Sequence, residues 1–356
     1  MPATSHVHAH RWPGVPLALA SAFLFGIAAP ASKLLLDGVD PQLFAGVLYL
    51  GAGVGLAAVH LGRAAFGTEP PEASLRRADL PWLTGAVLFG GVAGPLLLML
   101  GLAGTSAANG SLLLNLEGLS TMVIAWLAFR ENVDRRLLLG AAAILLGALV
   151  LSWHGQGVRL DAGGLLIAAA CLCWGIDNNL TRKLSSGDPV MIALIKGLAA
   201  GGVNLVLALL RGATMPPPGT LAAAAVIGFL GVGVSLVLFV LALRHLGSAR
   251  TGAYFSLAPF IGAAIAVAFL GDPPTGRMAA AGLLMALGLW LHLVERHEHE
   301  HEHEAMEHDH RHVHDEHHRH THDGTVAEPH AHPHRHEPIR HRHVHYPDLH
   351  HRHVHG

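Results

Sequence analysis

Long apolar runs, broken by short polar or glycine- and proline-containing stretches, make up most of the first 294 residues. A helix needs about 20 apolar residues to cross the roughly 30 Å hydrocarbon core of a bilayer, where only helices and closed barrels satisfy the backbone. The pattern predicts an all-α polytopic membrane protein. Its ten predicted transmembrane helices lie at residues 14–36, 41–61, 81–103, 105–129, 137–154, 160–181, 188–210, 219–243, 248–270 and 275–294.

The basic residues outside these runs are unevenly distributed between the two faces of the membrane. When the connections are assigned alternately, eleven Lys and Arg residues fall on one face and four on the other. Cytoplasmic loops are enriched in Lys and Arg, so we expect a multi-pass protein of the cell (inner) membrane with both termini in the cytoplasm. Only 13% of all residues are charged, which excludes an ordinary soluble protein. The charge balance gives no indication of a nucleic-acid partner.

The two halves of the apolar region share short motifs in the same order and at a nearly constant offset. The motif at 104–117 aligns with that at 247–259, and Phe129-Arg-Glu131 aligns with Leu270-Gly-Asp272. Five spans per repeat is an odd number, so the second repeat starts from the opposite face. The sequence predicts two inverted five-helix repeats, which enclose a shared site. The predicted domains are a cytoplasmic N-terminus at 1–13, the repeats at 14–154 and 155–294, and a tail at 295–356.

These motifs resemble those of the drug/metabolite transporter superfamily, and specifically its EamA-type permeases, over residues 14–294. The most specific pieces are Gly104-Thr-Ser-Ala-Ala-Asn-Gly-Ser111 and Arg244-His-Leu-Gly-Ser-Ala-Arg250. The resemblance implies secondary transport of small organic molecules, often export, without an ATP-binding module. The chain departs from the family at Glu117, where the fourth span of such repeats commonly has Pro, as Pro259 in the ninth.

Three ionisable side chains lie within the predicted spans, namely Glu117, Asp177 and Lys196. A charge at membrane depth is costly and should face a cavity or a partner. Glu117 is central in its span, so we expect it to contact substrate or a coupling ion, with Lys196 as its partner. A purely structural Glu117–Lys196 salt bridge is the simpler alternative. Asp177 lies near the cytoplasmic end of the sixth span, where the alternative is a solvated helix end.

Three further residues are candidates for contacts with substrate. Asn178 follows Asp177, and Asn115 precedes Glu117 by two residues, although this spacing turns Asn115 away from the face of Glu117. Each Asn alone is as readily explained by a hydrogen bond between helices. Trp174 lies beside Cys173, and it is expected either in the aromatic belt at the membrane interface or along the transport pathway.

The tail at 295–356 contains 23 of the 30 His residues, many of them alternating with Glu or Arg. It lacks spaced apolar positions, so we expect it to be disordered on its own. Imidazoles interspersed with carboxylates bind divalent transition metals. The candidate metal ligands are His297, His299, His301, His303, His308, His310, His312 and His314.

Several functions remain open from the sequence. We expect a secondary transporter, by preference an exporter, of a small organic metabolite that works by alternating access. One alternative is a Ni, Co or Zn transporter fed or regulated by the tail, and another is a metal-sensing membrane receptor without flux. The isolated His residues of the spans carry no companion motif of an enzyme. No cofactor is required. The expected partners are the lipid bilayer and a small-molecule substrate, with divalent metal ions and a homodimer left open.

Overall fold

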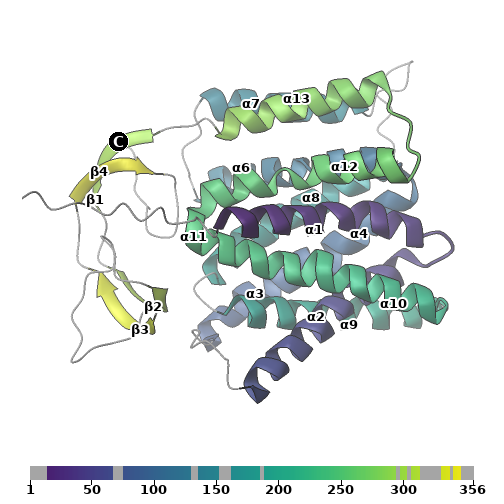
Figure 1. Cartoon of the computed structure of the whole chain (residues 1–356), viewed down its shortest axis with the longest axis horizontal. Helices are drawn as coiled ribbons and strands as arrows, with labels where there is room; N and C mark the ends of the chain where they lie inside the picture. The colour runs from purple at the N-terminus through teal and green to yellow at the C-terminus, as the bar shows by residue number, and fades with distance from the viewer. Residues whose placement is uncertain are drawn as a thin grey trace, which may run out of the picture.

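The computed structural model describes residues 14–66, 75–129, 135–151, 162–184 and 188–293, together with four strands between 297 and 345. The helices of this region pack side by side as one bundle (Figure 1). Their bounds are α1 Gly14–Leu35, α2 Pro41–Ala65, η1 Arg77–Asp79, α3 Leu80–Ala86, η2 Val87–Ala93, α4 Gly94–Ala103, α5 Ala107–Leu113, α6 Leu116–Phe129, α7 Arg135–Leu151, α8 Ala162–Thr181, η3 Arg182–Leu184, α9 Pro189–Leu210, α10 Pro218–Ile227, η4 Gly228–Val234, α11 Ser235–Phe255, α12 Ala258–Phe269 and α13 Gly276–Leu293.

Seven helical segments of the described chain are long and apolar enough to cross a membrane. Three shorter apolar helices, Leu138–Leu151, Ala258–Phe269 and Gly276–Leu291, fall where three further spans were expected. Many large apolar side chains point outward, among them Phe269 at 82% exposed and Leu61 at 67%. An outward apolar surface suits lipid rather than water. The chain is therefore a multi-pass α-helical membrane protein.

The fourth predicted span is interrupted, contrary to the expectation of one continuous helix at 105–129. The break lies at Leu114 and Asn115, between α5 and α6. The Asn115 side chain explains it, because its Nδ2 donates a 2.8 Å hydrogen bond to the carbonyl of Leu112. Asn side chains that bond nearby carbonyls compete with the helical ladder. The start of α6 places Glu117 in its first turn.

The turn predicted between the eighth and ninth spans is helical, since α11 continues from residue 235 to residue 255. The rings of Phe239 and Phe255 nevertheless lie 4.8 Å apart between centroids. Sixteen residues of straight helix would separate them by about 24 Å. The chain therefore reverses within α11, and Figure 1 shows α10 and α12 extending from α11 to the same side. The segments on either side of this reversal run antiparallel, and a separate turn at Ser256 and Leu257 precedes α12.

Two π-helical segments, η2 and η4, occupy corresponding positions in the two halves. They start at Val87 and Gly228, the same offset that separates Phe129 from Leu270 in the aligned motifs. Both lie within long apolar helices, and each includes glycines buried against other helices. A π segment leaves its carbonyls less regularly bonded than an α-helix and is frequent at functional sites.

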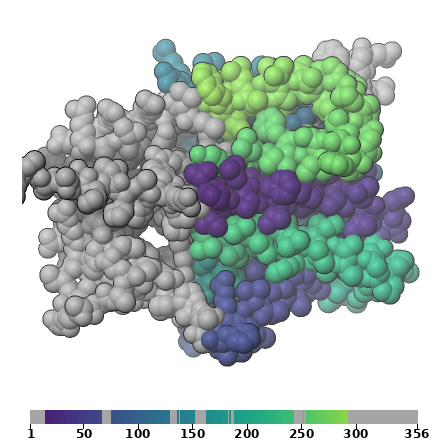
Figure 2. Space-filling view, viewed as in Figure 1, coloured from purple at the N-terminus to yellow at the C-terminus, as the bar shows by residue number. Residues whose placement is uncertain are grey.

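The two halves are interleaved rather than separate. Helix α1 packs on η4, α11 and α12, and α8 packs on η2, α4 and α6. Helix α2 packs on α9, and α7 packs on α13. In Figure 2 the purple α1 lies between the teal α10–α11 and the green α12, which belong to the second half of the chain. The contacts of α1, the first span of the first half, with second-half helices therefore match those of α8, the first span of the second half, with first-half helices.

Helices α7 and α13 each place a glycine against the backbone of the other helix. A Cβ on Gly147 would lie 2.9 Å from the carbonyl oxygen of Ala281, and a Cβ on Gly288 would lie 2.6 Å from that of Gly140. The offset of the internal repeat converts one contact into the other, because it relates Gly147 to Gly288 and Gly140 to Ala281. Only small residues let helix backbones approach this closely. Glycine therefore stands at both of these related positions.

The tail contains strands where the sequence predicted disorder. Strand β1, His297–Glu302, pairs antiparallel with β4, Arg340–His345, and β2, Met306–His312, pairs with β3, His330–His336. His alternating with charged residues has the two-residue period of a strand, and the disorder of the tail on its own stays a prediction. In this register His stands opposite His, as in His299 opposite His343.

Candidate functional site

A polar cluster surrounds the π-helical segment η2. The hydroxyl of Tyr49 donates to the carbonyl of Gly90 at 2.8 Å, and the indole Nε1 of Trp174 donates to the same oxygen at 3.0 Å. The Nδ2 of Asn204, which is fully buried, lies 3.3 Å from the carbonyl of Gly91 and 3.2 Å from that of Val92. Side chains from α2, α8 and α9 thus satisfy the carbonyls that the π segment frees.

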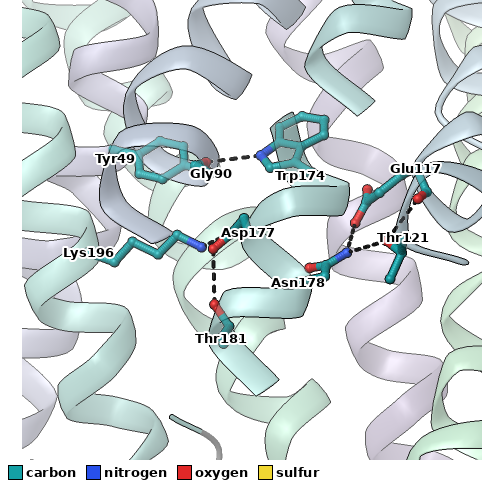
Figure 3. A network of polar contacts seen from close by, with 9 residues as sticks. All are labelled: Tyr49, Gly90, Glu117, Thr121, Trp174, Asp177, Asn178, Thr181 and Lys196. Carbon is teal, nitrogen blue, oxygen red and sulfur yellow. Dashed lines mark hydrogen bonds and ion pairs between the residues drawn. The ribbon is translucent and has the colours of Figure 1, made fainter. Parts of the chain in front are cut away.

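The ion pair of this cluster joins Asp177 to Lys196. The Nζ of Lys196 on α9 bonds to Oδ2 of Asp177 on α8, and the hydroxyl of Thr181 donates to the other carboxylate oxygen at 3.0 Å. Both charged residues are buried. Glycine at position 90 is required for this packing, because a Cβ there would lie 1.9 Å from Oδ2 of Asp177. Figure 3 shows the pair beside the η2 segment.

The predicted Glu117–Lys196 salt bridge is wrong. Lys196 is bound by Asp177, whereas Glu117 lies on α6, which packs against α8. Sequence spacing along separate helices does not reveal which carboxylate a lysine on a third helix meets. The expectation that Asp177 is a solvated helix end is likewise wrong, since this residue is only 4% exposed.

A second polar cluster is built around Glu117. The amide Nδ2 of Asn178 donates to Oε1 of Glu117 at 3.0 Å and approaches the hydroxyl oxygen of Thr121 at 3.1 Å. Thr121 in turn donates to the backbone carbonyl of Glu117 at 2.9 Å. Glu117 is partly buried and Asn178 is exposed. In Figure 3 this cluster lies on the other side of α8 from the Asp177–Lys196 pair.

The two remaining sequence candidates, Asn115 and Trp174, are buried in contacts between helices. Asn115 is buried away from these clusters, where its Nδ2 lies 3.8 Å from the sulfur of Met285 on α13. Trp174 is buried and meets the ring of Phe25 edge-on, with centroids 6.4 Å apart. Phe25 also contacts the ring of Phe255 at 5.1 Å. Phe25-Gly-Ile27 in the first span and Trp174-Gly-Ile176 in the sixth are corresponding motifs of the two repeats, so two corresponding residues meet each other.

Sequence reasoning missed Tyr49. The signal was weak: it is one of three tyrosines in the whole chain, in the middle of a glycine-rich apolar span. Its hydroxyl needs a partner once it is buried, but only the folded chain identifies that partner as Gly90.

The predicted metal ligands are divided between described and undescribed residues. His297, His299 and His301 lie on β1, and His308, His310 and His312 lie on β2. His303 and His314 lie outside the described residues. Among the side chains that the structure describes, no three His, Cys, Asp or Glu gather as metal ligands.

The fold defines a class, namely polytopic helical membrane proteins, and polar side chains are buried between its helices. The EamA-like transporter family matches the chain twice, at residues 12–153 and 161–294. The chain belongs to this family, which confirms the resemblance found in its motifs and assigns it to transporters rather than enzymes.

Known relatives agree with this assignment. A protein of Methanothermobacter thermautotrophicus named "Uncharacterized transporter" is 30% identical over 79% of this chain and 85% of its own length. A "Probable terminal-alkyne amino-acid exporter" of Streptantibioticus cattleyicolor is 24% identical over 74% of this chain and 88% of its own length. A solved crystal structure, 19% identical, shares the fold with a TM-score of 0.59 over 78% of this chain and 94% of its own.

Proposed function

We propose that the protein is a secondary transporter that exports a small organic molecule by alternating access between two inverted five-helix repeats. The observation that carries this proposal is that equivalent helices of the two halves make matching contacts with the opposite half. Two inverted repeats that pack around one site have two near-equivalent arrangements, one open to each face. The family match at two successive stretches, 12–153 and 161–294, supports the same division of the chain.

The site of transport in this proposal lies where the repeats meet. Phe25 and Trp174, which the repeat aligns, are in ring contact. Glu117 and Asn178 belong to different repeats and are joined by a hydrogen bond. A ligand bound there contacts both halves, so its binding is sensitive to their relative movement.

Three polar contacts connect helices at the end of the bundle that we expect to face away from the cytoplasm. Lys33 on α1 donates to the carbonyls of Leu102 and Ala103, which end α4, at 2.5 and 3.2 Å. Asp272 accepts from the backbone N–H of Ala108 at 2.7 Å, and Arg211 lies 3.6 Å from Asp40. The α1–α2 and α12–α13 connections lie at this same end, on the right of Figure 1. These contacts support a conformation closed on that face.

The proposal also covers the membrane in which the protein resides and the direction of transport. The excess of basic residues in alternate connections supports both termini in the cytoplasm and residence in the cell membrane. Export is supported by the names of two relatives. One is the amino-acid exporter above, and the other is a "Probable amino-acid metabolite efflux pump" of Salmonella typhimurium, 25% identical over 53% of this chain and 68% of its own length.

The test is flux in proteoliposomes that contain the full chain. We expect the protein to exchange a radiolabelled small organic molecule across the bilayer, and Glu117→Gln to abolish this exchange while membrane insertion and gel-filtration behaviour stay normal. Asp37→Asn, which changes an exposed carboxylate in the α1–α2 connection, is the matched control and should keep wild-type exchange. Unchanged flux in the Glu117→Gln variant contradicts the role of this carboxylate.

A second candidate function concerns the tail. The strand register sets His297, His299 and His301 of β1 opposite His345, His343 and His341 of β4. Such density of His favours binding of a divalent transition metal, by which the tail would feed or regulate transport. Flux of radioactive Ni, Co or Zn that is lost when residues 295–356 are removed would favour a metal transporter. Metal binding without any flux would favour a sensor.

A further inference from the structure

We propose that the transported molecule carries a protonated amine, which binds between the carboxylate of Glu117 and the side-chain amide oxygen of Asn178. The inference deepens the proposed function and rests on it. It concerns the chemical class of the substrate, which neither the family match nor the fold assigns.

The charges of the two polar clusters provide the first argument. In the part of the chain that the structure describes, Lys196 is bound by Asp177, and no ion pair includes Glu117. A carboxylate within a transmembrane segment is costly unless a cation meets it. Because the buried Lys196 is paired with Asp177, the counter-charge for Glu117 comes from the ligand.

The free hydrogen-bonding atoms provide the second argument. The Nδ2 of Asn178 is used by Oε1 of Glu117 and the hydroxyl of Thr121. The carboxylate is acceptor-only, so it fixes the orientation of the Asn178 amide. Oε2 of Glu117 and Oδ1 of Asn178 then remain as acceptors without a donor among the described residues. An ammonium group offers three donors and no acceptor, which matches these two oxygens.

The surroundings favour an organic cation over a metal ion. Asn178 follows Trp174 by four residues, so both lie on the same side of α8. The rings of Trp174 and Phe25 form a T-shaped pair, and aromatic surface suits both a cation and the apolar remainder of an organic molecule. Ca²⁺ and Mg²⁺ need six or more oxygen ligands, whereas one carboxylate and one amide oxygen supply fewer.

The experiment compares three probes of similar shape in proteoliposomes with the full chain. They are radiolabelled isopentylamine, leucine, and 2-hydroxy-4-methylpentanoate, in which a hydroxyl replaces the amine of leucine. We expect the wild-type protein to exchange the amine-bearing probes at least about tenfold faster than the hydroxy acid, the loss typical of a missing charged hydrogen bond. Glu117→Gln should lose exchange of the amine-bearing probes, and the control Asp37→Asn should retain it.

A second measurement separates an amine site from a proton-coupling site. Exchange is measured with the same pH on both sides of the membrane, and accumulation is measured with a pH gradient. An amine-binding Glu117 is needed for both, so Glu117→Gln loses both. A carboxylate that only couples protons is needed for accumulation alone, so surviving exchange in this variant would overturn the inference and leave the transport function intact.

Two further outcomes are decisive. Equal exchange of the hydroxy acid and leucine by the wild-type protein would overturn the amine inference but support transport. Absence of flux for every probe, combined with no stabilisation of the purified protein against heat by isopentylamine, would overturn both. Thermal stabilisation by isopentylamine but not by isopentanol, lost in Glu117→Gln, supports the site independently of flux.

Discussion

Asp177 and Asn178 are consecutive residues of α8, yet they bind helices on different sides of it. Asp177 pairs with Lys196 on α9, and Asn178 bonds to Glu117 on α6. Successive residues of a helix point about 100° apart, so one helix turn connects a buried ion pair to a partly exposed carboxylate. The proposed substrate site at Glu117 and the Asp177–Lys196 pair therefore share one turn of α8.

Breaking the buried ion pair should destabilise the protein. Lys196→Met leaves the Asp177 carboxylate without its cation, which typically costs about 3–5 kcal/mol. Thermal unfolding in detergent measures this loss. The double variant Asp177→Asn/Lys196→Met should recover most of the stability, because neither charge is then buried alone. Equal destabilisation by the single and double variants would contradict the unpaired Asp177 carboxylate as the cause of the loss.

Gly90 should not tolerate even a methyl group. In Gly90→Ala the added Cβ collides with the Asp177 carboxylate, and such overpacking costs about 1–3 kcal/mol or more. Gly202→Ala in α9 is the matched control, because its Cβ meets nothing within 4 Å. We expect a lower melting temperature and weaker transport only for Gly90→Ala. If both variants behave alike, close contact between η2 and α8 is not needed.

The hydrogen bonds of Lys33 should stabilise the conformation closed on the outer face. The probe is Asn178→Cys in a chain whose two native cysteines are replaced, Cys171→Ala and Cys173→Ala. We expect a membrane-impermeant thiol reagent to label it from the cytoplasmic side. Adding Lys33→Met should increase labelling from the outer side. Labelling from the outer side that does not depend on Lys33 would contradict this role.

Asn115 should matter for folding but not for transport. Asn115→Ala removes the hydrogen bond to the carbonyl of Leu112 at the α5–α6 break, a loss of about 1 kcal/mol. A small drop in melting temperature with unchanged exchange per folded molecule is expected. Asn178→Ala is the contrasting variant, with the opposite pattern of unchanged stability and lost exchange. A flux defect in Asn115→Ala at full stability would assign Asn115 to the pathway.

Much of the architecture could be predicted because it depends on local periodicity and composition. Apolar runs of spanning length predict membrane helices wherever they occur, and the offset between the motifs at Phe129 and Leu270 reappears between the starts of η2 and η4. The misjudged elements are those in which a side chain competes with the helical ladder. Asn115 ends α5, and the sequence gives no measure of whether such an Asn bonds its own backbone or a neighbouring helix.

The sequence identified most of the polar side chains of the two clusters but not their pairings. Glu117, Asp177, Asn178 and Lys196 all stand out, since polar groups inside apolar spans are rare. Their partners depend on how far each helix rotates and slides against its neighbours, and close approach at Gly90 or Gly147 decides that packing.

The sequence by itself therefore determined a membrane-embedded helical protein with an internal repeat and a carboxylate in its fourth span, because hydrophobicity and spacing are properties of the chain. Its motifs added the resemblance to a transporter family. Only the tertiary structure decided that Lys196 belongs to Asp177 and that Glu117 keeps an oxygen free. Ion pairing depends on distances of a few ångströms between helices far apart in sequence, and those distances exist only after the helices have packed.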